Sequence, residues 1–239
     1  MKSFFLTSVL VGFCLHLPTS AFAGEFAEPK LVQNLFAESY IPKGFDNNDL
    51  VQIVAEGVFS NGCYKPGKIA VHVDENKKVI HVDPYAYIYS GLCIQVMVPY
   101  HQVLDIGILR GGNYKIIQGA TGKDLGALTV RSSTQAAADD YLYAPISQAY
   151  ISQKEGRSYL TLSGEFSNSC LKLDKVVVDL QPKVVVVQPI ANMSGTSDCQ
   201  TGVFAFERTV EIKNMPKGRF LLHVRSLNAK AVNNLFDIL

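Results

Sequence analysis

The sequence has no tryptophan and few charged residues, and neither sign of charge prevails. Charged residues make up 18% of the chain, and 22 Lys and Arg against 21 Asp and Glu give a formal net charge of +1. This balance provides no overall electrostatic attraction of the kind that phosphate backbones or anionic lipid surfaces select. We therefore expect no nucleic-acid partner.

The short motifs of the common enzyme classes are also absent. There is no G-x-S-x-G nucleophile elbow, no H-E-x-x-H pair, no Walker loop and no G-x-G-x-x-G after a strand. Carboxylates far apart in a sequence can still meet in a fold, but no pair of acids stands out here. The sequence favours a protein that is not an enzyme, and we nominate no catalytic residue.

The first residues of the chain predict export. Lys2 precedes an apolar stretch over residues 3–17, and a run of small residues ends at Ala23. This layout is typical of a secretory signal peptide, here residues 1–23. A retained membrane anchor is the alternative, but the run is shorter than the roughly 20 residues of a membrane span and Pro18 interrupts it. We expect a secreted or periplasmic protein with no membrane span after cleavage.

The rest of the chain contains an internal repeat. The segment GVFSNGC at residues 57–63 recurs as GEFSNSC at residues 164–170, with five of the seven positions identical. The correspondence continues in register over nearly the whole chain after the signal peptide. A repeat of about 100 residues is longer than a solenoid repeat and matches a common domain size. We predict a first unit over residues 24–131, a linker over 132–139 and a second unit over 140–239.

Each unit holds one pair of cysteines, once Cys14 is removed with the signal peptide. The partners lie 30 residues apart in the first unit and 29 apart in the second, which predicts disulfides Cys63–Cys93 and Cys170–Cys199. Closing a loop of this size stabilises a unit by about 3–4 kcal/mol in the chain-entropy model. There is no C-x-x-C redox pair and no clustered zinc spacing, so we interpret these cysteines as structural.

The pattern of side chains predicts β-structure almost throughout. Apolar and polar residues alternate over residues 160–166 and 94–98, the period of a strand with one face toward a core. Turn signals such as Asn61-Gly62 and Pro66-Gly67 separate the runs, giving about seven short strands per unit at the spacing of a β-sandwich.

Strand rhythm, one cysteine pair and a closing Gly-x-aromatic strand make each unit resemble the immunoglobulin-like or fibronectin-like sandwich modules of exported bacterial proteins. The resemblance implies an all-β fold of two tandem sandwich units, each with one internal disulfide. The core tryptophan usual in that family is missing here. Such sandwiches serve adhesins, chaperones, inhibitors and receptors alike, so the resemblance does not define a function.

Two histidines of the first unit are candidate metal ligands. The segments 69–74 and 79–83 predict a hairpin, and a turn at its midpoint makes His72 and His81 direct cross-strand neighbours on the outer face. With Asp83 on the same face, two imidazoles and a carboxylate could bind Zn or Cu. The competing interpretation, a solvated polar face with two incidental histidines, describes the more common situation. Without this site we expect no cofactor.

Three tyrosines also distinguish the first unit from the second. Tyr85, Tyr87 and Tyr89 are spaced by two, which aligns their rings on one face of a strand. Exposed tyrosines are enriched in surfaces that bind proteins and sugars. The alternative is that they cover the sandwich edge or pack between the units.

These features together predict an exported, non-enzymatic binding or interaction protein of the bacterial cell envelope or extracellular space. Its ligand would be a protein or a glycan, and the absence of tryptophan makes a glycan less favoured. The alternatives are a metal-binding protein that uses His72 and His81, and a structural spacer or inhibitor.

Overall fold

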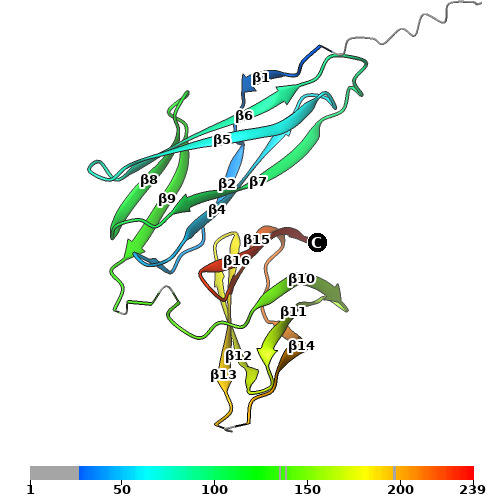
Figure 1. Cartoon of the computed structure of the whole chain (residues 1–239). Coiled ribbons are helices and arrows are strands. Elements are labelled where there is room, and N and C mark those ends of the chain that lie inside the picture. The colour runs from blue at the N-terminus through cyan, green and yellow to red at the C-terminus, as the bar shows by residue number, and fades with distance from the viewer. Residues whose placement is uncertain (1–26, 135, 138, 196–197) are drawn as a thin grey trace, which may run out of the picture.

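The computed structural model describes residues 27–134, 136–137, 139–195 and 198–239 (Figure 1). These residues form β-strands joined by turns and loops, so the prediction of an all-β fold is confirmed. No stretch of helix able to span a bilayer occurs in this part of the chain. The predicted signal peptide lies outside the described residues.

The first unit is a sandwich of two sheets. One sheet has the strand order β2-β4-β7, and the other is built on β5-β6-β8-β9. The short strand β1 pairs with β6, and β3 pairs with β9. The bounds are β1 (Lys30–Gln33), β2 (Glu38–Tyr40), β3 (Phe45–Asp46), β4 (Val51–Phe59), β5 (Tyr64–Asp74), β6 (Val79–Ile88), β7 (Val98–Gly107), β8 (Gly112–Gln118) and β9 (Asp124–Arg131).

The second unit repeats this arrangement strand for strand. Its sheets have the orders β10-β11-β14 and β12-β13-β15-β16. The bounds are β10 (Ile146–Lys154), β11 (Arg157–Asn168), β12 (Leu171–Gln181), β13 (Val184–Met193), β14 (Thr201–Ile212), β15 (Gly218–Ser226) and β16 (Lys230–Ile238). The prediction of seven strands fits this unit, whereas the described part of the first unit has β1 and β3 in addition. The exact unit boundaries stay predictions.

One strand pair in each unit is parallel. β6 runs parallel to β8 from the pair Val79 and Lys115, and β13 runs parallel to β15 from the pair Val184 and Leu221. Immunoglobulin sheets are antiparallel. The difference arises because each hairpin turns its second strand, rather than its first, toward the middle of the sheet. Side-chain alternation does not predict the parallel pairs, because it indicates which face of a sheet a residue occupies and not which strands lie next to each other.

The repeated sequence motif has a structural role that the first unit shows clearly. The ring of Phe59 stacks on Tyr100 with 4.1 Å between centroids. Gly57 leaves room for the same tyrosine, because a Cβ at this position would lie 2.5 Å from its hydroxyl oxygen. The Oδ1 atom of Asn61 accepts a hydrogen bond of 3.0 Å from the backbone N–H of Cys63. The motif therefore ends a core strand, turns the chain and places the cysteine.

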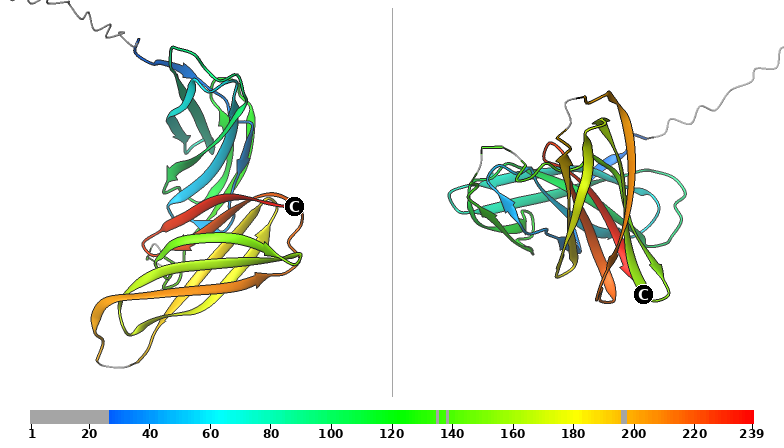
Figure 2. Two further views of the ribbon diagram at one scale, coloured as in Figure 1. Left: turned by 90° about the vertical axis from the view of Figure 1, so that its right-hand side faces the viewer. Right: turned by 90° about the horizontal axis from the view of Figure 1, so that it is seen from below.

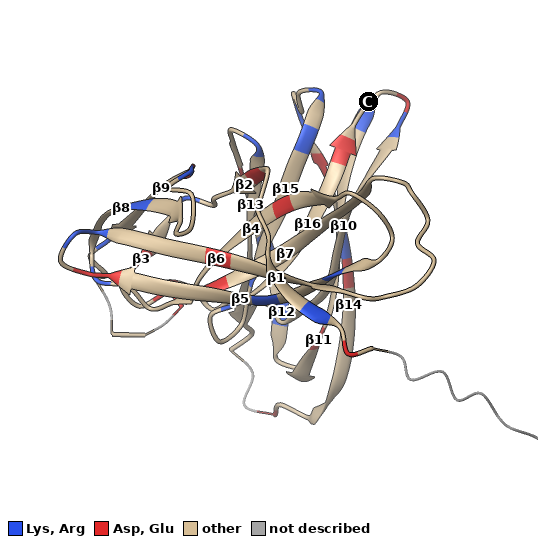
Figure 3. Cartoon of the chain, turned by 90° about the horizontal axis from the view of Figure 1, so that it is seen from above, with Lys and Arg blue, Asp and Glu red and all other residues tan. Residues whose placement is uncertain are grey.

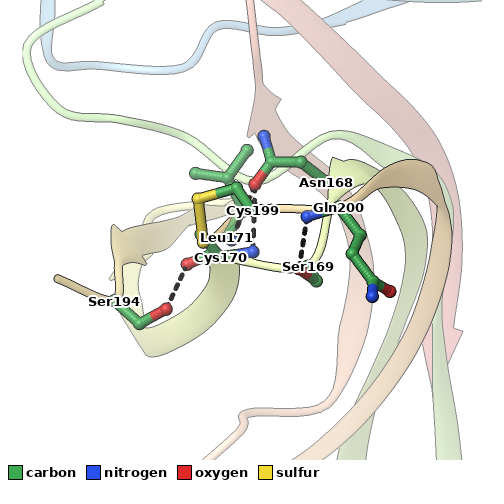
Figure 4. Close-up of a disulfide and its surroundings, with 7 residues drawn as sticks. All are labelled: Asn168, Ser169, Cys170, Leu171, Ser194, Cys199 and Gln200. Carbon is green, nitrogen blue, oxygen red and sulfur yellow. Dashed lines mark hydrogen bonds between the residues drawn. A yellow bond between two sulfur atoms is a disulfide. The ribbon is translucent and has the colours of Figure 1, made fainter. Parts of the chain in front are cut away.

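The second copy of the motif has the same structural role. Phe166 stacks on Phe206 at 4.7 Å, and Gly164 faces that ring across the strand pair. Asn168 Oδ1 accepts a hydrogen bond of 3.0 Å from the N–H of Cys170 (Figure 4). The structural interpretation of these shared residues is thus supported by their contacts.

Both predicted disulfides are present. Cys63 joins Cys93 and Cys170 joins Cys199, each with 5.3 Å between the Cα atoms. In the second unit Ser194 Oγ donates a hydrogen bond to the carbonyl oxygen of Cys170, which ties the end of β13 to the bridge (Figure 4). Each disulfide therefore holds a loop against the turn of the repeated motif.

One predicted turn is wrong. Pro66-Gly67 lies inside β5, where the pairing with β6 shifts register between Pro66 and Ile69. Gly67 is required by space at this bulge, because a Cβ would lie 2.8 Å from the carbonyl oxygen of Tyr85. A Pro-Gly pair can mark a β-bulge on an edge strand as well as a turn.

The two units are packed together at a junction (Figures 1 and 2). The junction has its own small core. Tyr40 and Val54 of the first unit meet Val184, Val186 and Leu221 of the second, all buried. Seen from below in Figure 2, the strands of the second unit run across those of the first. The junction therefore covers the outer face of β13 and β15 with β2 and β4.

A buried ion pair also joins the units. The guanidinium of Arg225 lies 3.1 Å from the carboxylate of Asp49, and the two side chains are 7% and 8% exposed. The same guanidinium donates a hydrogen bond of 2.7 Å to the carbonyl oxygen of Gly44. Removing one partner of a buried pair leaves an uncompensated charge and typically costs 3–5 kcal/mol. The relative position of the units is thus specified by polar as well as apolar contacts.

His223 lies at the same junction. Its Nδ1 atom is 2.7 Å from Asn233 Oδ1, and its ring meets Phe45 of the first unit edge-on at 5.7 Å. Burial lowers the pKa of His223 from 6.5 to about 4, although the hydrogen bond with Asn233 opposes the shift and the nearby Arg225 adds to it. The folded protein therefore holds this imidazole neutral.

A first prediction concerns the duplicated glycine. We expect Gly164→Ala to lower the free energy of unfolding by about 1–3 kcal/mol, because overpacking in a well-filled core costs this much. An added Cβ would overlap the carbonyl oxygen of Pro145 as well as the Phe206 ring. Denaturant unfolding measures the change, and Gly195→Ala is the control because nothing lies within 4 Å of its added Cβ. Equal stability of the two variants would contradict the packing argument.

A second prediction concerns acid stability. Below pH 6.5 the unfolded chain protonates this histidine, whereas the folded chain does not until about pH 4. Stability from His223 is therefore complete above pH 6.5 and is lost progressively down to pH 4, about 3 kcal/mol in all. Denaturant unfolding at several pH values should show this loss in the wild type and a smaller one in His223→Gln. An identical pH dependence of the two proteins would refute the assignment.

Candidate functional site

The predicted histidine pair is formed. His72 and His81 are directly paired residues of β5 and β6, with 6.1 Å between their ring centroids. Ile80 and Val82 are buried on the other face of β6, so the alternation places both imidazoles outward as expected. The geometry of the pair is confirmed, while metal binding stays a prediction.

Asp83 is less suited to be the third ligand. Its Oδ1 atom accepts hydrogen bonds from Gln33 Nε2 at 3.1 Å and from the backbone N–H of Ala120 at 3.0 Å. Within the described part of the chain, no group of three His, Cys, Asp or Glu side chains is placed to hold a metal ion. The outer face of β6 therefore offers a pair of histidines, and the carboxylate predicted as their third ligand already has hydrogen-bond partners.

The tyrosines lie on the same outer face, toward the end of β6. Tyr85 is half-buried, with Lys68 Nζ 5.6 Å from its ring centroid. Tyr87 and Tyr89 are 36% and 46% exposed. Leu31 of β1 pairs with Tyr87 and is also exposed. The rings thus form a partly open surface next to β1.

The loop between β6 and β7 carries an apolar surface that the sequence analysis missed. Leu92 is fully exposed, and Ile94, Met97 and Val96 are 73%, 68% and 53% exposed. We call these four side chains the apolar tip. The predicted strand over residues 94–98 is wrong, because β7 begins only at Val98.

The backbone of this loop is firmly attached. The disulfide joins Cys93 to Cys63, and the N–H of Gly62 donates a hydrogen bond of 2.9 Å to the carbonyl oxygen of Ile94. At the start of the loop the N–H of Tyr89 donates to the carbonyl oxygen of Cys63 at 3.0 Å. The apolar side chains therefore project from an anchored loop and do not fold back over the core.

The second unit provides an internal comparison. When Cys93 is aligned with Cys199, Leu92 corresponds to Asp198 and Ile94 to Gln200, both polar and exposed. A comparison of the two copies therefore distinguishes Leu92 and Ile94 from the sequence alone. Met97 corresponds to Val203, which is also exposed, so the copies differ in polarity at Leu92 and Ile94. The shared fold does not explain this difference.

A cleft of about 480 Å³ lies beside the junction of the units. Arg131 and Arg225 line it together with Asp140 and Asp179. Charges of both signs are present, and the Arg225 guanidinium is engaged by Asp49. We assign no ligand to this cleft.

Residues 53–124 match the family model of the ORF11 β-sandwich domain. The matched segment runs from β4 into β9 and includes the histidine pair, the three tyrosines and the apolar tip. No curated protein and no solved structure matches the chain. The similarity supports the sandwich fold of the first unit.

A third prediction concerns the metal hypothesis. Because Asp83 is held by other partners, we expect calorimetric titrations of the wild type and His72→Ala with Zn or Cu to coincide. One equivalent of metal bound by the wild type and lost in the variant would contradict this expectation and favour the metal-binding alternative.

Proposed function

We propose that this is an exported binding protein without catalytic activity, which acts through the end of its first unit formed by the apolar tip with Tyr87 and Tyr89. One observation carries the proposal: four aliphatic side chains stand largely exposed on a disulfide-anchored loop. Contiguous exposed apolar surface on a soluble protein marks interaction sites.

The size of the surface supports binding. Burying one Leu, Ile, Val or Met side chain contributes about 1.5–3 kcal/mol, so the four could contribute on the order of 6 kcal/mol at the lower end. The disulfide reduces the ordering cost because the loop backbone is fixed before binding. Export is supported by the two disulfides, which persist in oxidising compartments, and by the signal-like sequence at the start of the chain.

The structural-spacer alternative has its own support in the junction. The buried pair of Asp49 and Arg225 and the shared core of Tyr40 with Val186 fix one unit against the other. The second unit then holds the binding end at a set position. A spacer role and a binding role are compatible in this arrangement.

A fourth prediction tests the binding role. The double variant Leu92→Asp with Ile94→Gln gives the tip the residue types that the second unit has at the corresponding positions, Asp198 and Gln200. We expect its affinity for a bacterial envelope fraction, measured by co-sedimentation, to fall more than tenfold, since about 3 kcal/mol or more of apolar burial is lost.

Val203→Asp is the matched control, because Val203 is 74% exposed on β14 of the second unit and should not take part. Changing Tyr87 and Tyr89 to Ser should weaken binding less than the tip variant. Absence of binding by the wild type, or equal binding by the tip variant, would remove the proposed function.

A further inference from the structure

We propose that the apolar tip docks onto the surface of an anionic lipid bilayer, with the aliphatic side chains in the hydrocarbon boundary and the tyrosines at the level of the headgroups. This inference rests on the proposed function and names its partner.

The tip lies in a long uncharged part of the chain. Residues 84–100 contain no Asp, Glu, Lys or Arg. The ribbon of this loop accordingly carries neither charge colour in Figure 3. Entering a bilayer with a charged side chain is costly, whereas Leu, Ile, Val and Met enter favourably. The loop therefore meets the first requirement for contact with hydrocarbon.

The residue types behind the tip are layered. Tyr89 and Tyr87 follow at the end of β6, and their rings have an apolar body and a polar hydroxyl. Tyrosine is enriched at the boundary between hydrocarbon and water for this reason. Lys65 of β5 pairs with Tyr87, and Lys30 of β1 pairs with Ile88. The tyrosines and these two lysines therefore lie at one level behind the aliphatic tip, which corresponds to the headgroup level of a bilayer.

The composition of the tip favours lipid over a protein partner. The residues that dominate protein interfaces are Trp, Tyr and Arg, whereas Leu and Val are under-represented among them. The tip consists of Leu92, Ile94, Val96 and Met97, with no arginine and no tryptophan. A hydrocarbon surface needs no shape complementarity, and protruding aliphatic side chains suit it well.

Local charge specifies an anionic surface. The segments that form this end are residues 27–33, 59–68 and 84–100, and their basic side chains Lys30, Lys65 and Lys68 are all exposed. Glu28 is the single acidic residue in these segments. The balanced charge of the whole chain conceals this local excess. Lysines close to a negatively charged membrane are attracted to it within a Debye length.

The test uses purified lipid vesicles. The full chain is expressed, recovered after export and checked by N-terminal sequencing, then sedimented with vesicles of phosphatidylglycerol and phosphatidylethanolamine, or of phosphatidylcholine alone. We expect the wild type to bind the anionic vesicles at least tenfold more tightly than the neutral ones. Binding should weaken as salt is raised, because screening removes the lysine contribution.

Three variants locate the contact. Leu92→Asp with Ile94→Gln should lose at least tenfold in vesicle affinity, and Val203→Asp should lose nothing. Lys65→Gln with Lys68→Gln should reduce the preference for anionic over neutral lipid. Retained disulfides and an unchanged unfolding midpoint show that each variant is folded.

A single introduced tryptophan provides a second measurement, since the chain has none of its own. The fluorescence of Met97→Trp should shift to shorter wavelength on anionic vesicles and be quenched by brominated lipid, whereas Val203→Trp should show neither effect. No binding to either vesicle, or no shift at position 97, overturns the lipid inference.

The outcomes separate this inference from the proposed function. If the tip variant loses binding to the envelope fraction while the wild type does not bind pure vesicles, the proposed function stands and its partner is a protein or a glycan. If the wild type binds neither material, both proposals fail.

Discussion

The disulfide between Cys63 and Cys93 is the constraint on which the functional end of the molecule depends. The repeated motif turns the chain after Phe59, and the bridge ties the following loop to that turn. Without this attachment, burial would drive Leu92 and Ile94 toward the core or toward another chain. The equivalent disulfide of the second unit, Cys170–Cys199, holds a loop that carries the polar residues Asp198 and Gln200. One scaffold thus supports two different surfaces.

Much of the fold could be predicted from the sequence, and the failures have physical reasons. Alternation predicted the inward Ile80 and the outward His81, and the repeat predicted both disulfides. Alternation failed at Ile94 and Val96, because it reports side-chain type and not whether a partner strand exists. β4 ends at Phe59, paired with Val98, so the residues before Val98 have a turn opposite them instead of a strand. The structure identifies the tip as apolar residues that have no place in a sheet.

The junction explains another difference between the copies. Val186 occupies the place of His81, and Leu221 occupies that of Lys115. In the second unit this face is covered by the first unit, so both faces of β13 are buried and Val184–Val187 reads as a continuous apolar run. In the first unit the equivalent face meets water. Packing therefore explains why one unit has His81 where the other has Val186. This weakens the functional significance of the histidine pair. Packing at the junction does not explain the difference between the two units at the apolar tip.

The junction is also a head-to-tail contact, a type that generates open filaments when both surfaces recur on every unit. On the sheet of each unit that lies away from the junction, the corresponding positions carry polar residues. His81 and Lys115 stand on the free face of the first unit, where Val186 and Leu221 provide apolar contact in the second. On the second unit, Thr161 replaces Val54 and bonds to Thr209 at 3.0 Å. The apolar contacts of Val54, Val186 and Leu221 therefore do not recur at these positions, which disfavours repetition of the same contact between further copies of the unit.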